Sequence, residues 1–141
     1  MKAYLDTSVL LRRVLGERGA FRDWGRLEKG YTSEIALVES SRTLDRLRLE
    51  GRLSDAEVSE RRRLLREMFQ AIGLIGLNRA VLNRASEAFP TIVGTLDAIH
   101  LASAWLYGEQ RKERLVFLTH DLRLATAAQA LGFEVLGAGL P

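Results

Sequence analysis

Short apolar runs alternate with longer helical patterns along the whole chain, and this alternation limits the folds that are open to it. The apolar runs cover residues 3–5, 31–33, 74–77, 115–119 and 133–136. Between them, apolar residues recur at helical spacing. Strands that alternate with helices predict a parallel sheet with helices on both faces. We therefore expect an α/β fold with a central, mostly parallel five-stranded sheet.

The predicted helices have recognisable start and stop signals. One helix passes through residues 9–14, and a short one covers about residues 18–28. Four side chains suited to N-caps each predict the start of a further helix. In chain order, these helices end at about residues 50, 71, 89 and 108. A last helix ends at about residue 131. The predicted caps are Ser33, Ser54, Asn78 and Thr95, and the predicted stops are Gly30, Gly51 and Gly132.

The length of 141 residues suits one domain with one core, and no linker or repeat divides it. The chain has no cysteine, which excludes disulfide scaffolds and thiol chemistry, and its two histidines argue against a histidine-based zinc site. No apolar run approaches the roughly 20 residues of a membrane span. The N-terminus does not resemble a signal peptide, so we expect a cytoplasmic location.

In open parallel sheets, ligands bind beyond the carboxyl ends of the strands. Four acidic residues of this chain are predicted to lie at that edge. Asp6 directly follows the first predicted strand, and Asp121 follows the fourth after one residue. Glu39 and Asp97 lie near the N-termini of helices that should begin at the same edge. We expect the four to converge on one cleft, although each alone could be a structural acid of a loop or helix terminus.

Clustered carboxylates predict divalent-cation chemistry. Like charges that lie close together cannot all stay ionised without compensation. Ligation by carboxylate oxygens alone suits Mg²⁺ or Mn²⁺. Two such ions about 3.5–4 Å apart can activate water and stabilise both oxygens of an in-line phosphoryl displacement.

Four segments of the chain, taken in order, resemble the PIN-domain nucleases, and most closely the small VapC-type toxins of toxin–antitoxin pairs. They are residues 4–10, 32–39, 94–102 and 118–121. The segment around Asp97, with Ala98, His100 and Ala102, is fairly specific, and the ordered set of four is strong. The resemblance spans essentially the whole chain, and it implies a single PIN domain over residues 1–141 with a three-layer fold.

The resemblance implies a metal-dependent endoribonuclease that hydrolyses RNA phosphodiester bonds. Asp6, Glu39, Asp97 and Asp121 match the acidic residues of the family. Asp6 and Asp97 are the expected principal ligands of Mg²⁺ or Mn²⁺, and the other two acids complete the shell directly or through water. The resemblance also implies a cognate VapB-type antitoxin that holds the enzyme inactive, and a homodimer.

Hydroxyl and imidazole groups flank the acids. The hydroxyls of Thr7, Ser8 and Thr119 could bond a carboxylate, a scissile phosphate or the backbone of a strand-to-helix junction. We predict these three as substrate-binding residues. We predict His100 as a packed, hydrogen-bonded residue and His120 as a solvent-facing loop residue.

The segment from residue 42 to 66 holds eight arginines against five acids. We expect a solvated helical hairpin with ion pairs one turn apart, with phosphate steering as the alternative. Apolar residues of the hairpin predict core packing or a groove for an antitoxin helix. They are Leu37, Leu44, Leu47, Leu64, Leu65, Met68 and Phe69, and Trp24 and Trp105 are predicted packing anchors.

Other functions fit the sequence less well. A receiver domain requires paired acids after the first strand and a late lysine, and a haloacid-dehalogenase phosphatase requires Asp-x-Asp there. Asp6 is followed by Thr7 and Ser8, which argues against both. Two alternatives stay open: a PIN-fold module that binds RNA or protein without cleavage, and a PIN nuclease that acts in RNA processing or on structured DNA.

Overall fold

Five strands form one sheet in the computed structural model, which describes residues 1–139. The strands are β1 (Lys2–Leu5), β2 (Lys29–Ser33), β3 (Gly73–Ile75), β4 (Val116–Leu118) and β5 (Val135–Leu136). Their order is β3-β2-β1-β4-β5, and every neighbouring pair is parallel. The predicted α/β class and five-stranded sheet are confirmed, with parallel pairing throughout.

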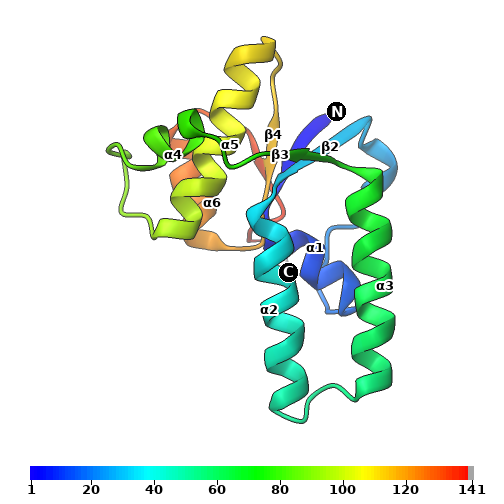
Figure 1. The fold of residues 1–141 in the computed structure, drawn as a ribbon. Coiled ribbons are helices and arrows are strands. Elements are labelled where there is room, and N and C mark those ends of the chain that lie inside the picture. The colour runs from blue at the N-terminus through cyan, green and yellow to red at the C-terminus, as the bar shows by residue number, and fades with distance from the viewer. Residues whose placement is uncertain (140–141) are drawn as a thin grey trace.

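Helices connect the strands, as Figure 1 shows. They are α1 (Thr7–Val14), α2 (Ile35–Leu49), α3 (Asp55–Ala71), α4 (Arg79–Ala85), α5 (Thr95–Arg111) and α6 (Leu122–Ala130), with a single 3-10 turn, η1 (Trp24–Arg26). Each strand therefore returns to the same end of the sheet before the next one begins, which places all carboxyl ends of the strands at one edge.

The two faces of the sheet bury alternate residues of the same strands. On one face, Ala3 and Leu5 of β1 pack with Val116 of β4 and with α1. On the other face, Tyr4 and Phe117 pack with α5 and α6. Helices on both faces of a central sheet make the expected three layers, and both faces of β1 and β4 are accordingly buried.

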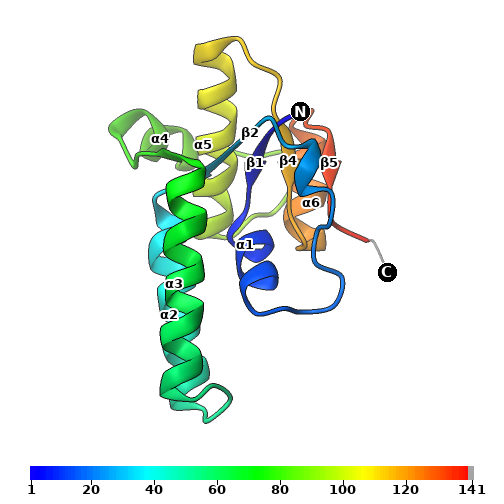
Figure 2. The same ribbon diagram turned by 90° about the vertical axis from the view of Figure 1, so that its right-hand side faces the viewer.

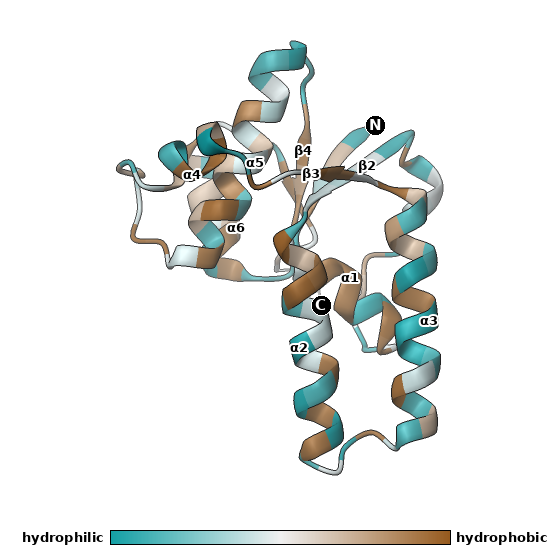
Figure 3. Cartoon of the chain, viewed as in Figure 1, coloured by the Kyte–Doolittle hydropathy of each residue, from teal (hydrophilic) through white to brown (hydrophobic). Residues whose placement is uncertain are grey.

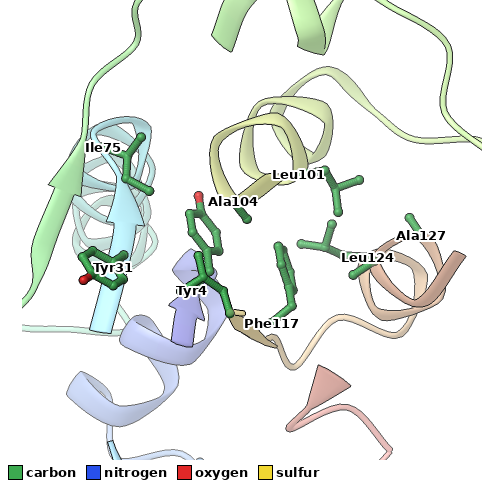
Figure 4. Packing of buried hydrophobic residues seen from close by; sticks show 10 residues of the cluster. Tyr4, Tyr31, Ile75, Leu101, Ala104, Phe117, Leu124 and Ala127 are labelled. Atoms are coloured by element: carbon green, nitrogen blue, oxygen red, sulfur yellow. The ribbon is translucent and has the colours of Figure 1, made fainter. Parts of the chain in front are cut away.

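The core on the α5 and α6 face is built around aromatic rings (Figure 4). The Tyr4 and Phe117 rings stack with centroids 5.2 Å apart, and Phe133 lies 5.5 Å from Phe117. Leu101 of α5 and Leu124 of α6 fill the space above them, and Figure 4 shows both side chains directed at Phe117. The strand that carries Asp6 is thereby fixed between two packed layers.

Helices α2 and α3 form a hairpin that projects beyond the sheet (Figures 1 and 2). Ser54 caps α3 in the predicted capping box with Glu57, and Gly51 adopts a φ of +72° after α2. Leu44 and Leu65 are buried between the helices and α1, which confirms core packing for much of the apolar stripe. Figure 3 shows that the first turn of α2 is hydrophobic, and Leu37 and Val38 are exposed there.

The hairpin arginines mostly pair with acids one turn away, as the sequence predicts. Arg42 and Arg48 both contact Asp45, and Arg63 contacts Glu60 and Glu67. Within residues 1–139, no acid pairs with Arg61, Arg62 or Arg66, which leaves three guanidinium groups on α3 without a salt bridge.

Several element boundaries differ from the prediction. The expected helix over residues 18–28 is only η1, because the chain turns at Gly19, where φ is +74°, and Gly30 lies inside β2 rather than ending a helix. Glu34, not Ser33, is the N-cap of α2, and Gly94, not Thr95, is the N-cap of α5. Helix α4 ends at Ala85 instead of residue 89, and α5 continues past Gly108 to Arg111.

Both tryptophans are partly buried in packing contacts, as predicted. Trp24 lies edge-on to Phe21 and donates its indole N–H to the Phe21 carbonyl, and Trp105 lies edge-on to Phe133. No helix in residues 1–139 has the length and apolar character needed to cross a membrane.

Candidate active site

The carboxyl edge of the sheet carries the predicted acids. Asp6 follows β1 and is the N-cap residue of α1, and Asp121 is the N-cap residue of α6 after β4. Because Leu5 pairs with Leu118 in parallel strands, both acids leave the sheet at the same edge. Glu39 lies in the second turn of α2, and Asp97 is the third residue of α5.

Asp6 is held by two hydroxyl groups. Ser8 Oγ donates to Asp6 Oδ2 at 2.6 Å, and Thr119 Oγ1 donates to the same oxygen at 2.9 Å. The residue is only 6% exposed. Its other oxygen, Oδ1, faces the imidazole Nε2 of His100 at 3.6 Å. The strand end thus presents one carboxylate oxygen that accepts no close hydrogen bond within residues 1–139.

Glu39 is held by two donors as well. Thr7 Oγ1 donates to Glu39 Oε1 at 2.9 Å, and His100 Nε2 approaches the same oxygen at 2.6 Å. Burial alone would raise the pKa of Glu39, but the hydrogen bond and charge of His100, together with the Thr7 hydroxyl, lower it below its ordinary value. Glu39 is therefore kept ionised in a half-buried position.

Asp97 has the opposite electrostatic setting. Burial raises its pKa, and the negative charges of Asp121 and Asp6 raise it further, with a smaller contribution from Glu39. No donor within residues 1–139 bonds its carboxylate. The raised pKa of Asp97 therefore comes first from its burial and then from the neighbouring carboxylates.

Asp121 uses one oxygen to cap a helix. Its Oδ1 accepts from the backbone N–H groups of Arg123 and Leu124 at 2.8 and 3.0 Å. Its own N–H donates to Thr119 Oγ1 at 3.0 Å, so one threonine links Asp6 and Asp121. The Oδ2 oxygen remains free of hydrogen bonds within the described residues.

As the side chains stand, no group of three or more His, Asp or Glu residues within 1–139 lies close enough to hold a metal ion. In this arrangement, one oxygen of Asp121 accepts backbone N–H groups of α6 and one oxygen of Glu39 lies against His100. The donor set nevertheless fits a hard divalent cation, because it consists of carboxylate oxygens with uncompensated charge at Asp97. Asp6, Asp97, Asp121 and Glu39 are the residues that could hold it.

The three hydroxyl residues near the acids bond carboxylates. Thr7 donates to Glu39, while Ser8 and Thr119 donate to Asp6. Thr7 and Thr119 are buried, at 4% and 0% exposure. Of the three contacts that the sequence left open for these hydroxyls, the structure shows two. Each hydroxyl donates to a carboxylate, and Ser8 and Thr119 also accept the backbone N–H groups of His120 and Asp121. Substrate binding by these residues stays a prediction.

The two histidines have roles that sequence patterns did not reveal. His100 is fully buried and hydrogen-bonded, as predicted, but its partners are the acid Glu39 and the Tyr4 hydroxyl. His120 is half-buried instead of facing solvent. It accepts the Phe21 N–H at Nε2 and donates from Nδ1 to the Gly137 carbonyl, and burial lowers its pKa. Only the one-turn spacing of His100 from Asp97 could have indicated its place at the site.

The family model of the PIN domain matches residues 3–130 of this chain. The chain belongs to the PIN domain family. The matched segment includes all four acids at the carboxyl edge of the sheet.

Known proteins of this family resemble the chain over nearly its full length. It is 28% identical over 138 residues to the ribonuclease VapC47 of Mycobacterium tuberculosis, and the match covers 96% of each chain. A solved structure of VapBC2 from Rickettsia felis, bound to a DNA fragment from its promoter, matches with a TM-score of 0.67 and 10% identity over 96% of this chain and 98% of that one. PAE2754 from Pyrobaculum aerophilum matches with a TM-score of 0.61 and 15% identity over 96% and 83%.

Proposed function

We propose that this PIN domain is a Mg²⁺- or Mn²⁺-dependent endoribonuclease and the toxin of a toxin–antitoxin pair. The observation that carries the proposal is the placement of acids from four elements at one sheet edge, where burial and the charges of Asp121 and Asp6 raise the pKa of Asp97. The full-length likeness to a VapC ribonuclease supports RNA as the substrate.

The acids have different tasks in this proposal. Asp6 and Asp97 are the principal ligands of the cation, because Asp6 Oδ1 and both oxygens of Asp97 accept no close hydrogen bond from the described residues. Asp121 contributes Oδ2 and Glu39 contributes Oε2, directly or through water. A bound cation lowers the pKa of a water molecule and stabilises negative charge on the phosphate oxygens.

Hydrogen bonds prepare the site for this chemistry. Ser8 and Thr119 fix one oxygen of Asp6 and leave the other available, and the α6 amides do the same for Asp121. No side-chain nucleophile is required, because water would serve as the nucleophile if a cation were held by these acids. Preorganised ligands of this kind reduce the reorganisation that the reaction needs.

Incubation of total cellular RNA with the purified chain tests the activity. We expect cleavage with Mg²⁺ or Mn²⁺ and none after a chelator removes them, because the acids alone cannot compensate charge on the phosphate. Mapping of the cut ends by sequencing measures the result. Cleavage that persists in chelator would exclude the metal-dependent mechanism, and intact RNA under all ionic conditions would favour a module that binds without cleaving.

A VapB-type antitoxin is the proposed protein partner, supported by the likeness to VapBC2. Leu37, Leu65 and Phe69 line a pocket between α2 and α3. Arg62 and Arg66 line it too, and neither forms a salt bridge within residues 1–139. An antitoxin segment with apolar and acidic side chains would complement this surface.

Expression of the chain alone is expected to arrest bacterial growth, and co-expression of the protein encoded beside it is expected to restore growth. Viable counts after induction measure both effects, and the mass of the co-purified complex reports its stoichiometry and the proposed homodimer. Normal growth of cells that express the chain alone would exclude the proposed toxin role. The proposed nuclease activity would then depend on the RNA cleavage assay alone.

A further inference from the structure

His100 is a fully buried imidazole that lies among the site acids. It follows Asp97 by one turn of α5 and is 0% exposed. Its Nε2 atom is 2.6 Å from Glu39 Oε1 and 3.6 Å from Asp6 Oδ1. Two carboxylate oxygens therefore lie within 3.6 Å of one nitrogen atom, although Asp6 and Glu39 come from different elements.

The protonation of this nitrogen follows from its partner. An ionised carboxylate only accepts hydrogen bonds, so the short contact to Glu39 requires a hydrogen on Nε2. This requirement holds whether the ring is neutral or charged. His100 is thus the donor, and Glu39 Oε1 accepts from it and from the Thr7 hydroxyl.

The other side of the ring is fixed by Tyr4. The Tyr4 hydroxyl lies 2.6 Å from His100 Nδ1, and the tyrosine oxygen also accepts the Ser33 N–H at 3.2 Å. Tyr4 itself cannot move, because its buried ring stacks on Phe117 (Figure 4). The imidazole is therefore held in one orientation by a rigid part of the core.

We propose that His100 is a positioning residue of the candidate metal site, in which Tyr4 orients the ring and Nε2–H holds the Glu39 carboxylate beside Asp6. This inference rests on the proposed function. Without this donor, Glu39 would lose its shortest hydrogen bond, and less would offset the repulsion between its charge and that of Asp6. Glu39 would then turn away and the ligand set would lose one member.

The test compares variants that differ in the donor. His100→Gln keeps an N–H group near the place of Nε2, whereas His100→Leu removes it and fills similar space. Tyr4→Phe keeps the stacked ring but removes the hydroxyl. Val58→Ala serves as a control for general destabilisation, because it truncates a buried side chain of α3, a helix that carries none of the site acids.

Calorimetric titration with Mn²⁺ measures the effect apart from activity. We expect His100→Leu to weaken Mn²⁺ binding about 10- to 100-fold, as loss of a residue that orients a ligand usually does. His100→Gln should recover most of this affinity, Tyr4→Phe should fall between the two, and Val58→Ala should bind as the wild type does. A long-range ¹H–¹⁵N spectrum of the metal-free protein should show hydrogen on Nε2 of His100.

The outcomes separate the two proposals. Wild-type affinity in His100→Leu, equal weakening in His100→Gln and His100→Leu, or an unprotonated Nε2 would each overturn the positioning role. A wild-type protein that binds Mn²⁺ with this ranking of variants but leaves RNA intact would overturn the proposed function alone. A wild-type protein that binds no Mn²⁺ would overturn both.

Discussion

Asp97→Asn is expected to reduce RNA cleavage by at least about 10²-fold, the order of loss seen when one preorganised electrostatic group is removed from an active site. The substitution keeps the size of the side chain but removes the negative charge that a cation requires. The raised pKa of Asp97 makes its charged form unfavourable in the folded chain. Above the ordinary pKa of an aspartate, loss of this charge should therefore leave the free energy of unfolding unchanged or increase it.

Parallel measurements of cleavage rate and thermal midpoint test both parts of this prediction. Asp55→Asn is the matched control, because Asp55 lies at the start of α3 with a side chain that is 92% exposed. It should cleave RNA at the wild-type rate. Full activity in the Asp97 variant would exclude the proposed ligand, and a large drop in its midpoint would mean that the activity was lost through unfolding.

Phe117→Ala is expected to destabilise the protein by about 3–5 kcal/mol, which is the usual effect of removing a large buried aromatic side chain. Phe117 is 0% exposed and lies between Tyr4 and Phe133, with Leu101 and Leu124 packed against it. The neighbouring strands and helices hold the cavity open, so little of the loss can be recovered by relaxation. Urea denaturation monitored by circular dichroism measures the free energy of unfolding.

Ile92→Ala is the control for this second prediction. Ile92 is 89% exposed, and its truncation should change the free energy of unfolding by no more than about 0.5 kcal/mol. A Phe117→Ala variant whose free energy of unfolding lies within about 1 kcal/mol of the wild-type value would show that the aromatic cluster contributes less than its burial indicates.

The sheet could be predicted from the sequence because its signals are local. Each central strand is a short apolar run, and the capping box at Ser54 lies within four residues. The failed prediction at residues 18–28 has a physical cause as well. Helical spacing alone does not show that a glycine will take a positive φ, and Gly19 does so at +74°.

The acids could be located from the sequence for a similar reason, since parallel strands send all their carboxyl ends to one edge. Their hydrogen bonds could not be predicted in this way. The contact of His100 with Glu39 joins residues 61 positions apart, and the bond from Thr119 to Asp6 joins residues 113 positions apart. Such pairings depend on the exact packing of side chains, which periodicity does not encode.

The pairing of β1 with β4 also has a consequence for folding during synthesis. Asp6 is translated before its partner, because the threonine that fixes it comes 113 residues later in the chain. Contacts so distant along the chain close late in folding. A nascent or prematurely terminated polypeptide that stops before β4 therefore lacks both Thr119 and Asp121 and has no assembled site.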